Sequence, residues 1–241
     1  MSLFKNQVAV ITGAGSGIGR ALALQLAAQQ AKLCLMGRNL YKLEEVAQIA
    51  QKTSPQVSTY QLDISEDEDI KTLKELTEKD FGDIDLLVHS AGIISFGELS
   101  NTSVVELDRQ YRTNVRAPYL LTQTFLPSLI SQQGQIVFIN SSAIYSVKAG
   151  GGQYAASKQA LKAIADSLRA EVNSLGVRVV SVYPGRTASP MQEEIYKTEG
   201  REYNPERLLQ PEDVASTIIS ALSLPRTAEV TDINIRPFLK A

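Results

Sequence analysis

Short apolar runs alternate with longer amphipathic segments along almost the whole chain. Several runs are apolar throughout, as expected for strands that are covered on both faces of a parallel sheet. They predict seven strands, at residues 8–12, 33–36, 57–62, 86–89, 136–139, 178–183 and 233–235. Strands that alternate with helices predict an α/β fold: a doubly wound parallel sheet with helices on both faces, in a single domain over residues 1–241.

Local residues predict where some helices begin. Two serines, each three residues before a glutamate, fit the capping box, and one proline suits a first helical position. These residues are Ser65 with Glu68, Ser103 with Glu106, and Pro211. After Tyr154, an apolar stripe at helical spacing predicts a helix of about five turns that packs on the sheet. The stripe consists of Leu161, Ile164, Ala165, Leu168, Val172 and Leu175.

Residues 187–210 form the longest stretch without a clear strand. The stretch is polar and begins just after a predicted strand ends. Ligands of doubly wound sheets bind beyond the carboxyl ends of the strands, so we expect this segment to be a mobile lid over a site.

Composition and charge exclude several classes of function. Twenty-four basic and 26 acidic residues leave a net charge of −2, which offers no strong field for nucleic acid or anionic membranes. No apolar run approaches the roughly 18 residues of a membrane span, and residues 1–7 show no signal-peptide pattern. Cys34 has no partner for an internal disulfide, and His89 is the single histidine, which disfavours a metal site and a serine hydrolase. We therefore expect a cytoplasmic protein without nucleic-acid or membrane partners.

A glycine-rich turn joins the first predicted strand to a helix. Its four glycines permit left-handed backbone and let N–H groups approach a pyrophosphate at the positive end of the helix dipole. The spacing departs from the general G-x-G-x-x-G fingerprint, so a tight turn without a ligand is the alternative. The position after the first strand of an alternating chain favours a dinucleotide. The residues concerned are Gly13, Gly15, Ser16, Gly17, Ile18 and Gly19.

The end of the second predicted strand indicates which dinucleotide is bound. NAD-binding chains usually carry an acid there for the ribose 2′-hydroxyl, but this chain has Gly37 and Arg38. A guanidinium suits a 2′-phosphate, so the residues favour NADP over NAD, with a merely solvated arginine as the alternative. Asp63, which follows the third strand, could accept a hydrogen bond from adenine or could cap the next helix.

Tyr154 and Lys158 lie four residues apart, so both project from one helix face. At an effective dielectric constant of about 20, an ammonium roughly 5 Å from a phenol favours the phenolate by about 3 kcal/mol. This predicts a lowered pKa for Tyr154 and makes it a candidate proton donor or acceptor for a carbonyl/alcohol pair. As an isolated pattern, the pair is also common on exposed helices.

Three further polar residues lie near the expected site. Ser141 and Ser142 end the fifth predicted strand, where either could donate to a substrate oxygen or cap the following turn. Asn114 lies within a helical pattern, in which asparagine is disfavoured. A water-mediated contact with Lys158 would account for it.

Together these residues resemble the short-chain dehydrogenase/reductase family over residues 8–237. The family's Thr-Gly-x-x-x-Gly-x-Gly is present at residues 12–19 and its Tyr-x-x-x-Lys at residues 154–158. The resemblance implies that Asn114, Tyr154 and Lys158 are catalytic, that Lys158 also binds the nicotinamide ribose, and that Ser141, thirteen residues before the tyrosine, is the catalytic serine. It also implies a homo-oligomer, a dimer or a tetramer. Further cofactor contacts implied by the resemblance are Ala91, Gly92, Pro184, Gly185, Thr187 and Ser189.

The chain departs from the family pattern in three places. The common Asn-Asn-Ala-Gly is His-Ser-Ala-Gly at residues 89–92, where we expect the fold and the cofactor contact to be retained. Ser16 stands where many NADP-dependent members have Arg or Lys, which leaves Arg38 as the main reader of the phosphate. Residues 229–237 lack the usual Asp-Gly-Gly and are more similar to a subgroup of NADP-linked hydroxy-acid and carbonyl reductases.

The sequence thus predicts an NADP(H)-dependent oxidoreductase. It would transfer hydride reversibly between the cofactor and a small ketone or aldehyde or the corresponding alcohol. The alternative is a dinucleotide-binding sensor or scaffold that keeps the fold without the reaction.

Overall fold

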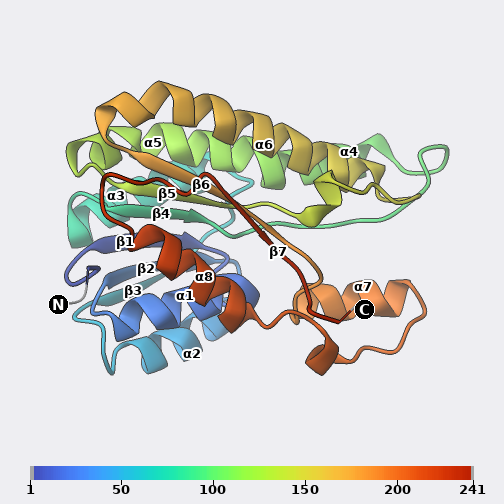
Figure 1. Cartoon of the computed structure of the whole chain (residues 1–241), viewed down its shortest axis with the longest axis horizontal. Helices are drawn as coiled ribbons and strands as arrows, with labels where there is room; N and C mark the ends of the chain where they lie inside the picture. The colour runs from blue at the N-terminus through green and yellow to red at the C-terminus, as the bar shows by residue number, and fades with distance from the viewer. Residues whose placement is uncertain (1–2, 240–241) are drawn as a thin grey trace.

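The computed structural model describes residues 3–239, and within them one parallel sheet runs through the molecule in the order β3-β2-β1-β4-β5-β6-β7 (Figure 1). The predicted fold class is confirmed, and each predicted strand end lies within one residue of the observed end. The strands are β1 (Val8–Thr12), β2 (Lys32–Gly37), β3 (Val57–Gln61), β4 (Leu86–His89), β5 (Gln135–Ile139), β6 (Arg178–Pro184) and β7 (Asp232–Ile235).

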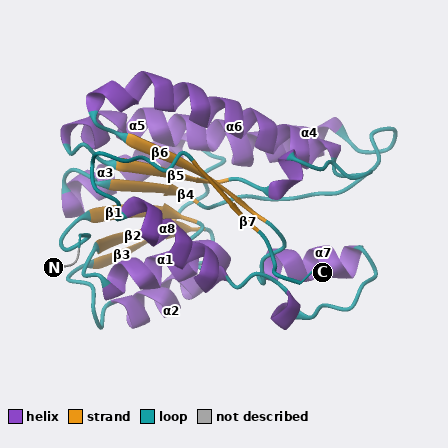
Figure 2. Cartoon of the chain, viewed as in Figure 1, coloured by secondary structure: helices purple, strands orange, loops and turns teal. Residues whose placement is uncertain are grey.

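Helices cover both faces of the sheet (Figure 2). Helices α1, α2 and α8 pack on one face, and α3, α5 and α6 pack on the other. The α-helices are α1 (Gly17–Ala28), α2 (Leu40–Ala50), α3 (Asp67–Phe81), α4 (Val104–Tyr111), α5 (Ala117–Ser131), α6 (Gly152–Val172), α7 (Pro190–Thr198) and α8 (Pro211–Leu222). Shorter turns are the π-helical η1 (Arg112–Arg116) and the 3₁₀ turns η2 (Ser142–Ile144), η3 (Asn173–Leu175) and η4 (Pro205–Arg207). No helix among residues 3–239 is both long and apolar enough to cross a bilayer.

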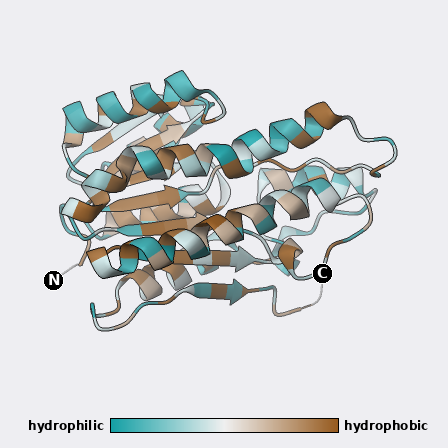
Figure 3. Cartoon of the chain, turned by 90° about the horizontal axis from the view of Figure 1, so that it is seen from above, coloured by the Kyte–Doolittle hydropathy of each residue, from teal (hydrophilic) through white to brown (hydrophobic). Residues whose placement is uncertain are grey.

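Two-sided burial explains why the central strands are apolar at nearly every position. Successive side chains of a strand point to opposite faces, so Ala9 and Ile11 join the core beneath α1, whereas Val8 and Val10 join the core beneath α5. Figure 3 shows the central strands as largely hydrophobic between helices whose outer turns are polar. The central strands therefore need apolar residues at both odd and even positions, and the sequence supplies them.

Of the three predicted helix starts, one is confirmed, one is confirmed in part and one is wrong. Pro211 is the first residue of α8, as predicted. Ser103 caps α4 by accepting a hydrogen bond from the backbone N–H of Val105, but Glu106 pairs with Arg109 and does not complete a capping box.

The predicted start at Ser65 and Glu68 is wrong. Helix α3 begins at Asp67, and the backbone N–H and hydroxyl of Ser65 both donate to Asp63 instead. Glu68 forms an exposed ion pair with Lys71. The hydrogen bonds of Ser65 therefore close a short-range turn at Asp63 and do not cap a helix.

The apolar stripe of α6 is largely as predicted. Leu161, Ala165, Leu168 and Val172 are buried against the sheet. Leu175 is an exception, because α6 ends at Val172 and Leu175 lies in the following turn, 47% exposed.

The strand order reverses between β1 and β4, and Thr12 joins the two strands there. Its buried Oγ1 donates to the carbonyl of Val88 at 3.2 Å and accepts the N–H groups of Ser90 and Ala91, each at 3.1 Å. One hydroxyl thus fixes the loop after β4 against the end of β1. This is the switch point at which doubly wound sheets open a crevice.

Thr12→Val should destabilise the fold, because the nearly isosteric valine leaves two backbone N–H groups without their acceptor. We expect the free energy of unfolding to fall by about 2–4 kcal/mol. Thr12→Ser keeps the hydroxyl and should lose about 1 kcal/mol for the missing methyl group. Urea unfolding followed by circular dichroism measures both variants. Equal losses for Val and Ser would contradict a role for the hydroxyl.

Candidate active site

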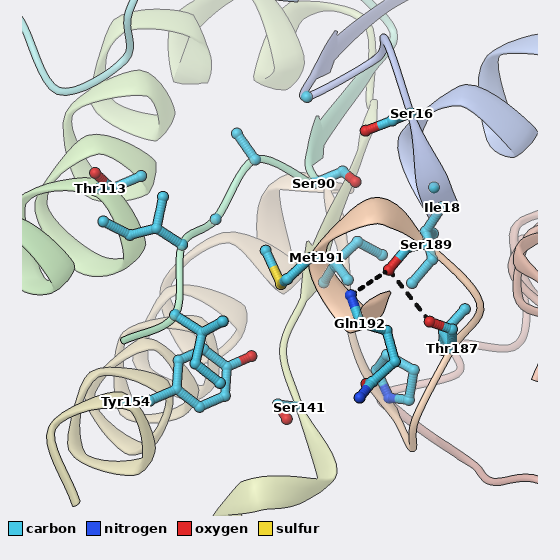
Figure 4. A pocket seen from close by; sticks show the side chains of 18 of the residues that line it. Ser16, Ile18, Ser90, Thr113, Ser141, Tyr154, Thr187, Ser189, Met191 and Gln192 are labelled. Carbon is cyan, nitrogen blue, oxygen red and sulfur yellow. Dashed lines mark hydrogen bonds between the residues drawn. The ribbon is translucent and has the colours of Figure 1, made fainter. Parts of the chain in front are cut away.

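One cavity of about 650 Å³ opens at the carboxyl ends of the strands. It brings together nearly all the residues that the sequence singled out, and Figure 4 shows several of their side chains converging on it. The predicted residues that line it are Gly13, Gly15, Ser16, Gly17, Ile18, Arg38, Asp63, Ala91, Gly92, Ser141, Tyr154, Lys158, Pro184, Gly185, Thr187 and Ser189. Gly19 and Asn114 stand behind its wall.

The glycine turn forms one end of the cavity. Gly13 has a φ of +67°, and a Cβ there would lie 2.9 Å from the backbone of Ala91. A Cβ on Gly19 would lie 2.5 Å from the carbonyl oxygen of Gly13, so Gly19 allows close packing and does not line the cavity. Ser16 precedes α1 without capping it by its side chain. The positive end of the helix dipole and its free N–H groups thus face the cavity, as an anion site requires.

Two cations stand beside this turn. Arg38 is exposed at the end of β2, and no ion pair involving its guanidinium occurs among residues 3–239. Lys42, in the first turn of α2, also lines the cavity, and a Cβ on Gly15 would lie 3.1 Å from its Cβ. The sequence interpretation missed Lys42, although its spacing of four residues from Arg38 could have indicated it. This end of the cavity is therefore doubly positive.

Asp63 stands at the same end and already has partners within the chain. One carboxylate oxygen accepts the N–H and the hydroxyl of Ser65 at 2.9 and 2.8 Å. A structural role in the turn before α3 is thus present, and its second carboxylate oxygen has no partner in these contacts. Its contact with adenine stays a prediction.

Tyr154, Ser141 and Lys158 meet at the middle of the cavity. Ser141 Oγ accepts the N–H of Ala143 at 3.1 Å, so its own proton remains available to the cavity. The serine therefore caps η2 and also faces Tyr154, which combines the two roles considered for it. Ser142 lines the cavity as well, but only Ser141 acts on the pKa of Tyr154.

Burial raises the pKa of Tyr154, and the contact with the Ser141 hydroxyl lowers it by less. Lys158 Nζ lies 5.8 Å from the centre of the Tyr154 ring and donates to the carbonyl of Ile139 at 3.0 Å. Burial lowers the pKa of Lys158 itself to about 8. The expectation of a lowered tyrosine pKa is therefore wrong for the protein alone, because burial of the phenol is the largest influence on its pKa and the opposing influence comes from Ser141, not from Lys158.

Asn114 lies in the π-helical turn η1 and fastens three segments together. Its Oδ1 accepts the N–H of Ile93 at 2.9 Å, and its Nδ2 donates to the Ile93 carbonyl at 2.9 Å and to Ser157 Oγ at 3.1 Å. The side chain thus joins η1 to the loop after β4 and to α6. These direct contacts account for a buried asparagine in a helical segment, and a water-mediated contact with Lys158 stays a prediction.

The departure at residues 89–92 leaves the local structure intact. His89 is buried, stacks on Phe138 with ring centres 4.6 Å apart, and contacts Thr122 Oγ1 at 3.0 Å. Burial lowers the pKa of His89 to about 3, so the ring is neutral. Ser90 and Ala91 remain on the cavity wall.

Residues 187–210 cover one side of the cavity and contain α7 and η4. The segment is tied at its base, where the N–H of Ala188 donates to the Leu209 carbonyl at 2.8 Å. Its own small core is the buried Tyr196. The guanidinium carbons of Arg186 and Arg201 lie 4.8 and 4.9 Å from the centre of the tyrosine ring. A segment that is fixed at its base and carries a separately packed helix has the arrangement expected of a lid. The mobility of residues 187–210 stays a prediction.

Comparison with known proteins identifies the chain's family. The family model described as short chain dehydrogenase matches residues 7–200. The chain belongs to the short-chain dehydrogenase family. An uncharacterized oxidoreductase of Staphylococcus aureus (strain N315) is 32% identical over 241 residues, which cover 98% of this chain and 100% of the relative.

Solved structures share the whole fold of this short-chain dehydrogenase. An alcohol dehydrogenase from the archaeon Thermococcus sibiricus, complexed with 5-hydroxy-NADP, has a TM-score of 0.87 at 27% identity and 98% coverage of both chains. A metagenomic short-chain oxidoreductase in complex with NADP has a TM-score of 0.84 at 29% identity, covering 98% of this chain and 99% of that one. Levodione reductase has a TM-score of 0.88 at 26% identity, with 97% of each chain covered. The short-chain dehydrogenase described here is therefore an oxidoreductase with a nucleotide-binding fold.

The buried Lys158 should cost this short-chain dehydrogenase stability at neutral pH. Its pKa of about 8 lies below the ordinary 10.5, so the unfolded chain binds more protons between these values and stability rises with pH across that window. We expect Lys158→Met to stabilise the protein by about 1–3 kcal/mol at pH 7, with the gain shrinking from pH 8 to pH 10.

Urea unfolding at pH 7, 8, 9 and 10 measures this gain. Lys148→Met, at an exposed position on the cavity rim, is the matched control and should leave stability nearly unchanged. A Lys158→Met protein that is less stable than the parent at every pH would show that the ammonium is a net stabilising group.

Proposed function

We propose that the protein is an NADP(H)-dependent carbonyl reductase that also oxidises the corresponding alcohol. The observation that carries the proposal is the meeting of Ser141, Tyr154 and Lys158 in the same cavity as a glycine turn at a helix N-terminus. A turn of this kind suits a pyrophosphate, and the three side chains suit proton transfer at a substrate oxygen.

The cavity residues fit the dinucleotide on structural grounds. Glycines of the turn line the cavity without side chains to cover the backbone, and Ser16 makes no side-chain cap, which leaves the first turn of α1 open to the cavity. Lys158, at the middle of the cavity, would reach the ribose next to the nicotinamide. When bound, the cofactor supplies or accepts the hydride.

The protein's own groups supply and place the proton. Burial raises the pKa of Tyr154, so the phenol is protonated at neutral pH and is ready to donate to a carbonyl oxygen during reduction. Ser141 would hold that oxygen with its free proton. Lys158 is charged at neutral pH, since its pKa is about 8, and it favours the phenolate that remains after transfer. These roles support reduction as the easier direction near pH 7.

The preference for NADP over NAD rests on Arg38 and Lys42. Both cations stand beside Gly15 and Gly37, at the place expected for a ribose 2′-phosphate. The related structures complexed with NADP or 5-hydroxy-NADP support the same choice.

The outer part of the cavity favours an apolar substrate. Phe96, Val147 and Met191 come from three separate segments, line the cavity, and are each more than a third exposed. Burying such surface against a ligand is favourable, so a ketone or aldehyde with a sizeable apolar body fits this rim.

Tyr154→Phe tests the proton donor. The variant should bind NADPH normally but lose turnover of carbonyl compounds by about 10²–10⁴-fold, the usual contribution of general acid catalysis. The measurements are NADPH fluorescence for binding and NADPH consumption for turnover. Tyr145→Phe removes a hydroxyl from a tyrosine that is 59% exposed and lies outside the cavity, and it should behave as the parent. Normal turnover by Tyr154→Phe would overturn the assignment, and a parent protein that binds NADPH without turnover across a broad carbonyl panel would favour the sensor.

Arg38→Gln tests the cofactor preference. Losing one charge-assisted contact should weaken NADPH binding by about 10- to 100-fold and leave NADH binding within about 3-fold. Titration of intrinsic NADPH and NADH fluorescence gives both dissociation constants. Lys52→Gln removes an exposed cation outside the cavity and serves as the control for general electrostatic attraction. Equal weakening of both cofactors by Arg38→Gln would contradict recognition of the 2′-phosphate.

A further inference from the structure

Gln192 carries a buried amide without a partner. The residue lies in the first turn of α7, is 8% exposed, and lines the cavity. Its Nε2 has no hydrogen-bond partner in the described part of the chain. Figure 4 shows the side chain on the side of the cavity opposite Tyr154, with its amide end directed toward the space beside Ser141.

Helix α7 itself gives no reason for this amide. The cap of α7 is already made by Ser189, whose Oγ accepts the backbone N–H of Gln192 at 3.2 Å. A buried donor without an acceptor destabilises the unliganded protein, so an apolar residue would serve the helix better. A donor kept unpaired at a cavity wall indicates a ligand that supplies the acceptor.

The neighbouring hydroxyl groups of Thr187 and Ser189 already donate hydrogen bonds to backbone carbonyls. Thr187 Oγ1 donates to the Gly185 carbonyl at 3.0 Å, and Ser189 Oγ donates to the Thr187 carbonyl at 3.2 Å. The resemblance implies that Ser189 contacts the cofactor, but the proton of its hydroxyl already has an acceptor in the chain. Gln192 Nε2 is the neutral donor that this segment leaves free toward the reacting centre.

The surroundings define the acceptor. Met191 and Ile195, on the same helix, also line the cavity and are apolar. A neutral N–H group among apolar neighbours matches a neutral carbonyl-type oxygen better than an anion, which would need a countercharge. Two ligands could supply such an oxygen: the carboxamide of the nicotinamide, or a second oxygen on the carbonyl substrate.

We propose that Gln192 donates a hydrogen bond to a carbonyl-type oxygen of the ligand at the reacting centre. The proposal rests on the proposed function, since it needs a nicotinamide or a carbonyl substrate in the cavity. It makes Gln192 a binding residue that sequence motifs do not indicate.

Gln192→Met tests the proposal, because methionine keeps the length and volume of the side chain without the donor. Gln123→Met, at an exposed position on α5 outside the cavity, is the matched control. For both variants we would measure thermal unfolding without ligand and binding of NADPH and of 2′-phospho-ADP-ribose, which lacks the nicotinamide. We would also measure kcat/KM for cyclohexanone and for 1,2-cyclohexanedione.

The two sources of the oxygen give different results. If the carboxamide is bound, Gln192→Met weakens NADPH about 3- to 10-fold and leaves 2′-phospho-ADP-ribose unchanged. If a second substrate oxygen is bound, NADPH binding is unchanged and kcat/KM falls about 3- to 10-fold for the dione alone. In either case the unliganded variant unfolds at the same temperature as the parent or higher, because no hydrogen bond within the protein is lost.

Other results overturn the proposal. Unchanged NADPH binding together with no selective loss on the dione would show that the amide meets no ligand oxygen. Lower thermal stability with equal weakening of NADPH and 2′-phospho-ADP-ribose would show a structural role in the lid. Failure of the parent protein to bind NADPH at all would be a failure of the proposed function, and it would be visible before any variant is compared.

Discussion

The site depends on one geometric constraint, that the carboxyl ends of all the strands meet at the same edge of the sheet. Where the strand order reverses, the loops after β1 and β4 leave in opposite directions and the edge opens. The Thr12 hydroxyl spans this point, holding the loop after β4 with two acceptor contacts and one donor contact. The glycine turn and residues 90–92 therefore lie side by side, and each forms part of the cavity wall.

The sequence predicted the central strands well because these strands are buried on both faces and are therefore apolar at nearly every position. A strand such as β1 or β5 is buried at every position, so its apolar run extends to within one residue of the ends of the strand. Helix starts depend instead on competition between short-range hydrogen bonds of similar strength. At residues 63–69, Ser65 donates a hydrogen bond to Asp63 in a turn, and α3 begins only at Asp67. The local backbone conformation decides between these hydrogen bonds, and a spacing rule does not record it.

The positions of the site residues were predictable from motifs, but their energetics were not. A fixed dielectric constant gives attraction between Tyr154 and Lys158, and that attraction would lower the tyrosine pKa. The folded chain buries both groups, and within residues 3–239 Lys158 Nζ has the Ile139 carbonyl as its single hydrogen-bond partner, so desolvation decides the sign of each pKa shift. Lys42 and Gln192 were missed for a related reason. The roles proposed for them depend on where α2 and α7 lie relative to the cavity, and neither residue type indicates a site by itself.

The pKa shifts of Tyr154 and Lys158 connect the expected loss of folding stability at the site to its proposed chemistry. In the unliganded protein the phenol of Tyr154 holds its proton, and no acidic side chain in the described part of the chain pairs with the ammonium of Lys158. A phenolate formed by donating that proton to a carbonyl oxygen would provide the missing negative charge next to Lys158, in a cavity from which the ligand has removed water. The interaction is therefore stronger after proton transfer than before it, which is the condition for a group to accelerate a reaction and not merely bind its substrate. A site that was electrostatically satisfied when empty would lack this difference, so in the proposed mechanism the destabilisation expected from Lys158 contributes to the acceleration of the reaction.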